Sequence, residues 1–246
     1  MRYIRKKPSP QAFEDWKSAN RPRNWSALQN EPHNPEEGVV YYSKNELREA
    51  LLLEQGHLCC YCQRRIENEP NMVIEHLFPR NGIDKAQGQA KMFEYDNLLA
   101  ACDGGALDNR NRPSRIPSYP QYCDKSKNED IIPLSPLQPD IENKLAYRQI
   151  GLDEVGIIPF IETDMDADLV INDRLNLNVP KLKNLRGKAI SGLIFQNPET
   201  GELISAEEAE TLLSAMEQQT GNPAIEYLPE FCSVKLYFLR LLTGRG

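Results

Sequence analysis

The chain has 246 residues, of which 40% are hydrophobic and 26% are charged, and its formal net charge is −7. This composition excludes a disordered chain and a generally basic nucleic-acid binder, and it suits one large folded domain or two small ones. No apolar run approaches the roughly 20 residues that a membrane-spanning helix needs, and none follows the basic start, so we expect a cytoplasmic protein. Its six cysteines are then better interpreted as metal ligands or free thiols than as disulfides.

Residues 1–55 are predicted to be an N-terminal arm followed by a lead-in helix. The first 28 residues carry seven Lys and Arg against two Asp and Glu, so the arm either attracts a phosphate backbone or is simply solvated. A short helix is expected near residues 11–19. Ser43 and Glu46 form a capping box that begins a second helix, and Gly56 ends it.

Residues 56–139 are predicted to be the functional core. A tight turn holds Cys59 and Cys62, and residues 72–74 form a strand that presents the next two side chains at its end. A second strand or helix begins near residue 96. Residues 103–122, rich in Gly, Pro and Arg, predict a surface loop, and residues 131–139 predict an extended linker.

Residues 140–246 are predicted to be mostly helical. Two strands are expected near residues 145–149 and 155–161. A helix begins near Pro180, another follows the capping box of Ser205 and Glu208, and a third covers residues 231–242. Residues 128–246 carry ten basic against nineteen acidic residues, which favours a surface for protein docking over one for nucleic acid.

The cysteine spacing predicts a structural zinc site of four thiolates. A pair two residues apart can grip one tetrahedral ion, and two downstream cysteines can complete the shell. The predicted ligands are Cys59, Cys62, Cys102 and Cys123. The fourth ligand stays open, because twenty residues separate Cys123 from Cys102. Cys60 and His57 are the alternative ligands.

Between these cysteines lie the residues expected to carry chemistry. His76 is the candidate general base, since a histidine titrates near neutral pH. Glu75 and Asp124 offer hard oxygen ligands that suit Mg²⁺ or Mn²⁺. Asn97 can bond the backbone between the two predicted strands and so hold His76 in place. Arg80 and Lys127 are candidate contacts for substrate phosphate or, equally, solvated cations.

In these residues the chain resembles the HNH (ββα-metal) endonuclease superfamily. The pattern consists of Cys59-x-x-Cys62, Glu75-His76, Asn97-Leu98 and Cys123-Asp124-x-x-Lys127. The resemblance implies an α+β fold with a zinc-stapled ββα-metal core, flanking N-terminal helices and a mostly helical C-terminal region. It also implies that the histidine is the base and that the acid before it and the residue after the last cysteine bind the catalytic cation. Asp124 stands where Asn or His is more frequent.

Flanking segments resemble the PtuB family, the HNH component of Septu-type antiphage defence systems, some of them attached to retrons. The matching segments are residues 1–6, 75–80 and 95–99, and residues 175–178 together with Leu182 and Arg186. The resemblance implies a nuclease effector that works with an ABC/SMC-type ATPase (PtuA-like), and in retron systems with a reverse transcriptase and its nucleic acid. Two alternatives stay open: a zinc-stapled binding module without catalysis, and a restriction-type nuclease that acts alone.

Overall fold

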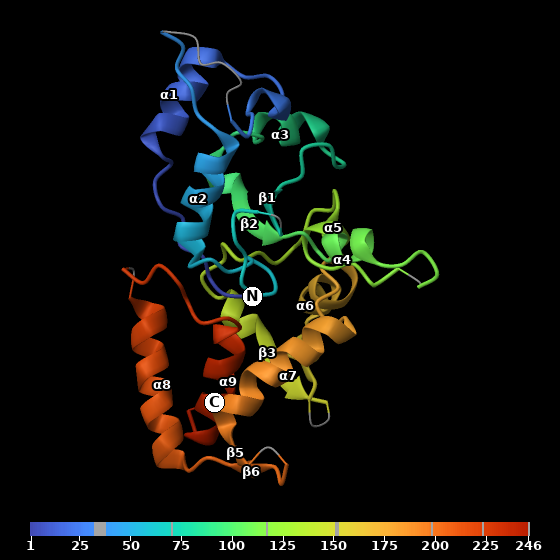
Figure 1. Ribbon diagram of the computed structural model, residues 1–246, viewed down its shortest axis with the longest axis vertical. Coiled ribbons are helices and arrows are strands. Elements are labelled where there is room, and N and C mark those ends of the chain that lie inside the picture. Colours follow the sequence, from blue (N-terminus) through green and yellow to red (C-terminus); the bar gives the residue numbers. More distant parts are fainter. Residues whose placement is uncertain are drawn as a thin grey trace.

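The computed structural model describes residues 1–31, 38–69, 71–116, 118–150, 153–197, 199–222 and 224–245. Within these ranges the fold is mixed α+β, and its strands form three separate two-stranded antiparallel sheets. Figure 1 shows α1, α2 and α3 at one end of the molecule and α7, α8 and α9 at the other, with β1 and β2 between them. None of the described helices has both the length and the apolar character that crossing a bilayer requires.

The elements follow one another in an order close to that expected from the sequence. In the first half they are α1 (Gln11–Asn20), η1 (Trp25–Ala27), α2 (Lys44–Gln55), β1 (Met72–His76), α3 (Lys85–Ala90), η2 (Tyr95–Asn97), β2 (Leu98–Cys102), α4 (Ala106–Asn111) and α5 (Asp124–Lys127). In the second half they are η3 (Ile141–Lys144), β3 (Leu145–Gln149), β4 (Val155–Pro159), α6 (Met165–Asp168), the π-helical turn η4 (Leu169–Arg174), α7 (Pro180–Ile194), β5 (Phe195–Asn197), β6 (Glu202–Leu203), α8 (Ala206–Gly221) and α9 (Cys232–Leu242).

Helix α2 delivers the chain to the first cysteine pair. Its capping box forms as predicted, with the Ser43 hydroxyl accepting from the backbone N–H of Glu46. Gly56 ends the helix in the left-handed region at φ 63°, and a Cβ there would lie only 2.4 Å from the Leu228 side chain. Both the conformation and the close approach therefore require glycine at this turn.

The β1–β2 pair is the centre of the fold, and its register places Glu75 opposite Leu99 and His76 opposite Leu98. Every residue of β2 is buried. The side-chain amide of Gln55 completes the outer edge of β2, donating to the Ala100 carbonyl and accepting from the Ala100 N–H, each at 2.8 Å. Buried backbone groups need such partners, so this pairing lets a two-stranded sheet sit inside the core.

The C-terminal region packs the β3–β4 hairpin against α7, and α9 against both α7 and α8. Pro180 occupies the first turn of α7, as expected. Arg186 of α7 is almost fully buried, and its guanidinium donates to the backbone carbonyls of Val155 and Leu177 at 2.7 and 2.9 Å. The arginine thus ties the helix to the hairpin and to the chain that precedes α7.

The basic N-terminal arm is packed into the molecule, contrary to the expectation of a free arm. Lys6 donates to Glu54 and to the Leu98 carbonyl, and Arg2 donates to the Thr220 carbonyl. Met1 is buried. The main cluster of buried apolar residues runs through all three predicted segments. Arg2 and Lys6 of the arm therefore help to hold these segments together.

Candidate metal centre and catalytic cavity

Three separate stretches of chain bring four buried cysteines together. Cys59 and Cys62 lie in the turn after α2, Cys102 ends β2, and Cys123 directly precedes α5. Their four sulfur atoms all lie within 4.8 Å of one another, and the Cys59–Cys123 and Cys62–Cys102 pairs are each separated by 3.9 Å. The predicted cluster of four cysteines is confirmed, including the uncertain member Cys123.

This arrangement fits a tetrahedral zinc ion. Zinc–thiolate bonds of about 2.3 Å in a tetrahedron place the sulfur atoms about 3.8 Å apart, whereas a disulfide would need about 2.05 Å. The Cys102 N–H donates to the Cys59 sulfur at 3.3 Å, a contact that favours a thiolate there. Cys60 and Cys232 are also buried but lie outside the cluster. His57 is outside it as well, stacked on Tyr227 at 4.1 Å.

A sharp return of the chain explains how Cys123 reaches the cluster from twenty residues away. Gly104 and Gly105 both have positive φ values, and a Cβ on Gly104 would lie 2.2 Å from the Tyr122 carbonyl oxygen. The Tyr122 N–H bonds the Gly104 carbonyl at 3.3 Å, and the Cys123 N–H bonds the Leu175 carbonyl at 2.8 Å. The segment between Cys102 and Cys123 therefore leaves and returns at nearly the same point.

A polar cavity of about 230 Å³ lies beside the cysteine cluster. Its walls come from the end of β1, the loop after β1 and the start of α5. The lining residues are Ile74, Glu75, His76, Pro79, Arg80, Asn81, Asp124, Lys125, Asn128 and Glu129. The structure thus brings Glu75, His76, Asp124 and Arg80 to one cavity, although 49 positions separate Glu75 from Asp124 in the sequence.

The imidazole of His76 is held by two neighbours. Its Nε2 lies 3.1 Å from the Met92 carbonyl oxygen, an acceptor that fixes the proton on Nε2 and leaves Nδ1 with its lone pair. The ring packs edge-on against Trp25 with centroids 4.5 Å apart. Burial, together with the charge of Arg80, lowers the pKa of His76 to about 3. The imidazole is therefore neutral at pH 7, as a general base must be.

Glu75 is buried and held by two polar groups. Its Oε1 accepts from the Tyr61 hydroxyl at 2.9 Å and pairs with the Lys127 ammonium at 2.8 Å. Burial raises the pKa of Glu75 to about 8; Lys127 opposes this shift and neighbouring Asp124 adds to it. Two carboxyl groups at one place are a poor arrangement for two free anions but a suitable pair of ligands for a hard cation.

Lys127 and Arg80 are placed differently from each other. The Lys127 side chain is fully buried and also donates to the His76 carbonyl at 3.1 Å. It cannot reach a phosphate in solvent, so the expectation of a substrate contact does not fit this residue; its role in the structure is to hold Glu75 and the end of β1. Arg80 is half-buried, lines the cavity and lies over the Trp25 ring at 5.5 Å.

Asn97 fastens the loop that follows β1. Its side-chain oxygen accepts from the Phe78 N–H at 2.7 Å, and its amide nitrogen donates to the carbonyls of Phe78 and Lys91. Its own carbonyl accepts from the Leu77 N–H at 3.0 Å. These bonds immediately follow His76 and place its backbone, while the amide itself does not line the catalytic cavity.

Sequence reasoning missed two residues that shape this site. Tyr61, between the paired cysteines, reaches Glu75, and Trp25 packs on His76. The position of Tyr61 within the cysteine turn is a signal that could have indicated it, because a turn fixed by a metal is a rigid base for a side chain. Trp25 gave no local signal, since its contact depends on how the N-terminal segment folds over β1.

The chain is similar to the "Retron Vc95 putative HNH endonuclease" of Vibrio cholerae serotype O1 biovar El Tor, with 26% identity over 152 residues, which cover 62% of this chain and 67% of that protein. No profile of a known protein family matches the chain.

Proposed function

We propose that this protein is a metal-dependent endonuclease of the HNH type that hydrolyses phosphodiester bonds in nucleic acid. The observation that carries the proposal is the meeting of a neutral histidine with a free Nδ1 and two carboxyl groups, Glu75 and Asp124, in one polar cavity beside the cysteine cluster. The similarity to a retron-associated protein described as an HNH endonuclease supports the same reading.

The residues divide the work of hydrolysis as follows. His76 accepts at Nδ1 the proton of the attacking water. Glu75 and Asp124 would hold a Mg²⁺ or Mn²⁺ ion, which when bound neutralises charge on the phosphoryl oxygens and stabilises the leaving oxygen. Arg80 adds a positive charge at the cavity wall. The four cysteines would hold zinc, which contributes folding energy and no chemistry.

Cleavage of supercoiled plasmid and of tRNA, each with Mg²⁺ or Mn²⁺, tests this function. Wild-type protein is expected to cut at least one substrate, and His76→Ala is expected to cut neither at a comparable rate. A zinc-loaded, folded wild-type protein that binds nucleic acid yet cuts nothing under these conditions contradicts the proposal, and favours a binding module instead.

We further propose that the protein acts as a defence effector together with an ABC/SMC-type ATPase, docked through its C-terminal region. Three large apolar side chains, two directly after β4 and one at the start of α6, support this: Phe160, Ile161 and Met165 are 62%, 60% and 75% exposed. Acidic residues flank them, among them Glu162 and Asp166. Exposed apolar groups with a charged border are typical of a protein-binding surface.

Co-purification with the ATPase of the neighbouring reading frame tests the docking. Ile161→Ser combined with Met165→Ser in the full chain is expected to lose the ATPase while keeping the fold. Ile83→Ser is the matched control, because Ile83 is 95% exposed and precedes α3, which lies with α1 and α2 at the end of the molecule away from α8 (Figure 1). If only the control loses the ATPase, the docking surface lies at the nuclease end.

A further inference from the structure

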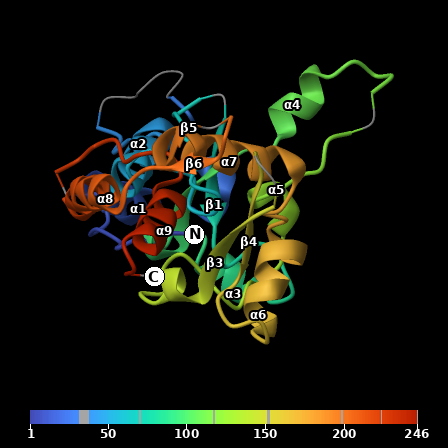
Figure 2. The ribbon, with the colours of Figure 1, turned by 90° about the horizontal axis from the view of Figure 1, so that it is seen from below.

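The segment from Asp103 to Tyr122, which we call the 103–122 arm, presents two different faces through α4. Figure 2 shows α4 and the chain after it projecting from the rest of the molecule. Ala106, Asn109 and Arg110 line one hollow, whereas Leu107, Asp108 and Asn111 line a separate cavity. Residues three or four apart share a face of a helix, so the arm separates two spaces.

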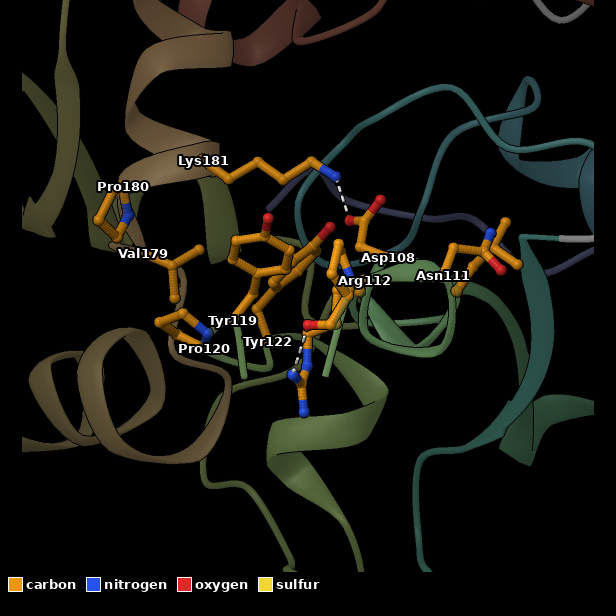
Figure 3. Close-up of a pocket in the computed structure, with 12 residues that line it drawn as sticks. Asp108, Asn111, Arg112, Tyr119, Pro120, Tyr122, Val179, Pro180 and Lys181 are labelled. Carbon is orange, nitrogen blue, oxygen red and sulfur yellow. Dashed lines mark hydrogen bonds and ion pairs between the residues drawn. The ribbon is translucent and has the colours of Figure 1, made fainter. Parts of the chain in front are cut away.

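The charged groups beside the separate cavity are already engaged. This cavity, of about 620 Å³, lies between the arm and the start of α7, where Lys181 forms an ion pair with Asp108 (Figure 3). Arg112 donates to the Ile116 carbonyl and to the Ser118 hydroxyl. These contacts anchor the arm against α7 and hold its far part in shape, and they leave little charge for a ligand.

Asn109 fixes the base of the arm. Its side-chain amide donates to the Tyr119 carbonyl at 3.1 Å and accepts from the Tyr119 N–H at 2.8 Å. These two bonds connect α4 to the segment of the arm that returns toward Cys123. An arm held in this way presents its side chains from a defined position. The neighbouring residue Arg110 is carried on α4 as well.

Two cations beside the α4 hollow, Arg110 on α4 and Lys125 on α5, are not engaged by other side chains. Arg110 and Lys125 are both exposed, and neither has an ion pair or a side-chain hydrogen bond within the described part of the chain. Lys125 lines both the α4 hollow and the catalytic cavity. Val73 and Ile74, adjacent on β1, line the hollow and the cavity respectively. The two spaces are therefore neighbours along β1, joined at Lys125.

We propose that Arg110 and Lys125 bind backbone phosphates of the nucleic acid that flanks the cleaved bond, so that the 103–122 arm is a second binding site for the substrate. The proposal rests on the proposed nuclease function for the choice of ligand. A chain with a net charge of −7 does not attract a polyanion as a whole, and the cavity wall carries Glu75, Asp124 and Glu129 against Arg80 and Lys125. A further cation beyond the cavity, Arg110, would then add to the attraction.

The lining of the α4 hollow favours phosphate over a protein partner. Apart from Val73 and Ala106, the residues that line it have polar or charged end groups, although their aliphatic parts supply much of the wall: Asp103, Asn109, Arg110, Gln121 and Lys125. Protein interfaces have apolar centres from which charged residues are depleted, whereas phosphate contacts come from Arg, Lys and side-chain amides. The carboxylate of Asp103 accepts from the backbone N–H groups of Gly105 and Leu107 at the start of α4, and within the described residues it forms no ion pair with Arg110 or Lys125.

Salt dependence of binding is the measurement that tests this site. Fluorescence anisotropy would follow a short labelled DNA duplex and a single-stranded RNA of matching sequence, over a range of NaCl concentrations, without added divalent cation so that nothing is cut. The variant is Arg110→Gln combined with Lys125→Gln, which keeps most of each side-chain stem. The control is Arg148→Gln combined with Lys188→Gln, an equal change of charge at exposed positions of the C-terminal region.

Loss of two phosphate contacts is expected to reduce the slope of log K against log salt by about 1.8 for the duplex or about 1.4 for the single strand. The control is expected to keep the wild-type slope. A reduced slope with either nucleic acid supports the phosphate site and shows whether the site binds duplex DNA or single-stranded RNA. If the variant and the control have equal slopes with both the duplex and the single strand, the proposed phosphate site is wrong. It is also wrong if the variant keeps its nucleic-acid binding and loses a co-expressed protein partner.

This experiment, set beside the plasmid and tRNA cleavage assay, separates this site from the proposed nuclease function. If the wild-type protein cuts nothing but the slope falls in the variant, the phosphate site stands and the nuclease function fails. If the wild-type protein cuts and the slope is unchanged, the nuclease function stands and the phosphate site fails.

Discussion

The ammonium of Lys127 lies 2.8 Å from a carboxylate oxygen of Glu75, and both side chains are almost completely shielded from solvent. The pair joins α5 to the end of β1, and the same ammonium also bonds the His76 carbonyl. The two elements that carry the candidate cation ligands are thereby held at a fixed separation.

Removing this lysine is expected to be costly. Above pH 8, where the Glu75 carboxyl is ionised, Lys127→Met would leave a buried carboxylate without its charge partner, and breaking a buried pair on one side typically costs about 3–5 kcal/mol. Arg174→Ala is the control, since it breaks a half-exposed ion pair with Asp130, a kind of pair worth at most about 1 kcal/mol. Urea unfolding of both variants measures the difference, and equal losses would show that the buried pair has no special role.

Removing the base is expected to stop cleavage without unfolding the protein. His76→Ala should lower the rate by about 10²–10⁴-fold and keep the bound zinc. His57→Asn is a matched control: His57 is equally buried but lies outside the cavity, and asparagine tolerates its positive φ. Glu75→Ala and Asp124→Ala should also lose activity, with partial recovery at raised Mn²⁺. A His76→Ala protein that cuts at the wild-type rate would exclude the mechanism.

Zinc is expected to be structural and present at about one ion per chain. Structural zinc sites contribute on the order of 10–16 kcal/mol in small peptides, which is comparable to the stability of a whole domain. Cys62→Ser or Cys102→Ser should therefore yield insoluble or locally unfolded protein. Cys60→Ser and Cys232→Ser, at buried cysteines outside the cluster, should keep their zinc. Elemental analysis of purified protein decides this, and a well-folded protein free of zinc would rule the site out.

The pH dependence should come from the cation site. The pKa of Glu75 is raised to about 8, so without a cation its carboxyl is mostly protonated at pH 7, and a proton must leave before a cation binds. The Mn²⁺ concentration for half-maximal rate should rise about tenfold per pH unit below pH 8. The pKa of His76, lowered to about 3, keeps the base neutral throughout this range. Rates at saturating Mn²⁺ should therefore change little between pH 8 and 6, and a loss following an ordinary histidine pKa would contradict this account.

Local signals predicted most of the regular elements. The capping boxes at Ser43 and Ser205 both form, and Pro180 begins its helix. These succeed because caps and first-turn prolines act through backbone groups only a few residues away. Residues 103–122 were predicted as loop throughout, yet residues 106–111 form α4. The two glycines and several prolines of this segment favoured a loop. The short helix α4 forms nevertheless, and the ion pair between Asp108 and Lys181 of α7 stabilises it.

The candidate site was predicted in its composition and less well in its geometry. The cysteine set could be read from spacing, because a metal restricts its ligands to a few patterns. The burial of Lys127 could not be predicted, because nothing in the local sequence distinguishes a lysine that pairs with a buried carboxylate from a solvated one. The packing of the N-terminal arm against the rest of the molecule was not predicted for the same reason, because Lys6 and Glu54 are distant in the sequence and form their ion pair only in the folded chain.

Cys123 and Asp124 are consecutive, so one peptide unit belongs to both the cysteine cluster and the catalytic cavity. A zinc ion held by the cluster would therefore also fix the position of Asp124. Assembly of the two proposed sites would then be ordered, with zinc binding before the hard cation, and the supply of one metal would set how much protein can respond to the other.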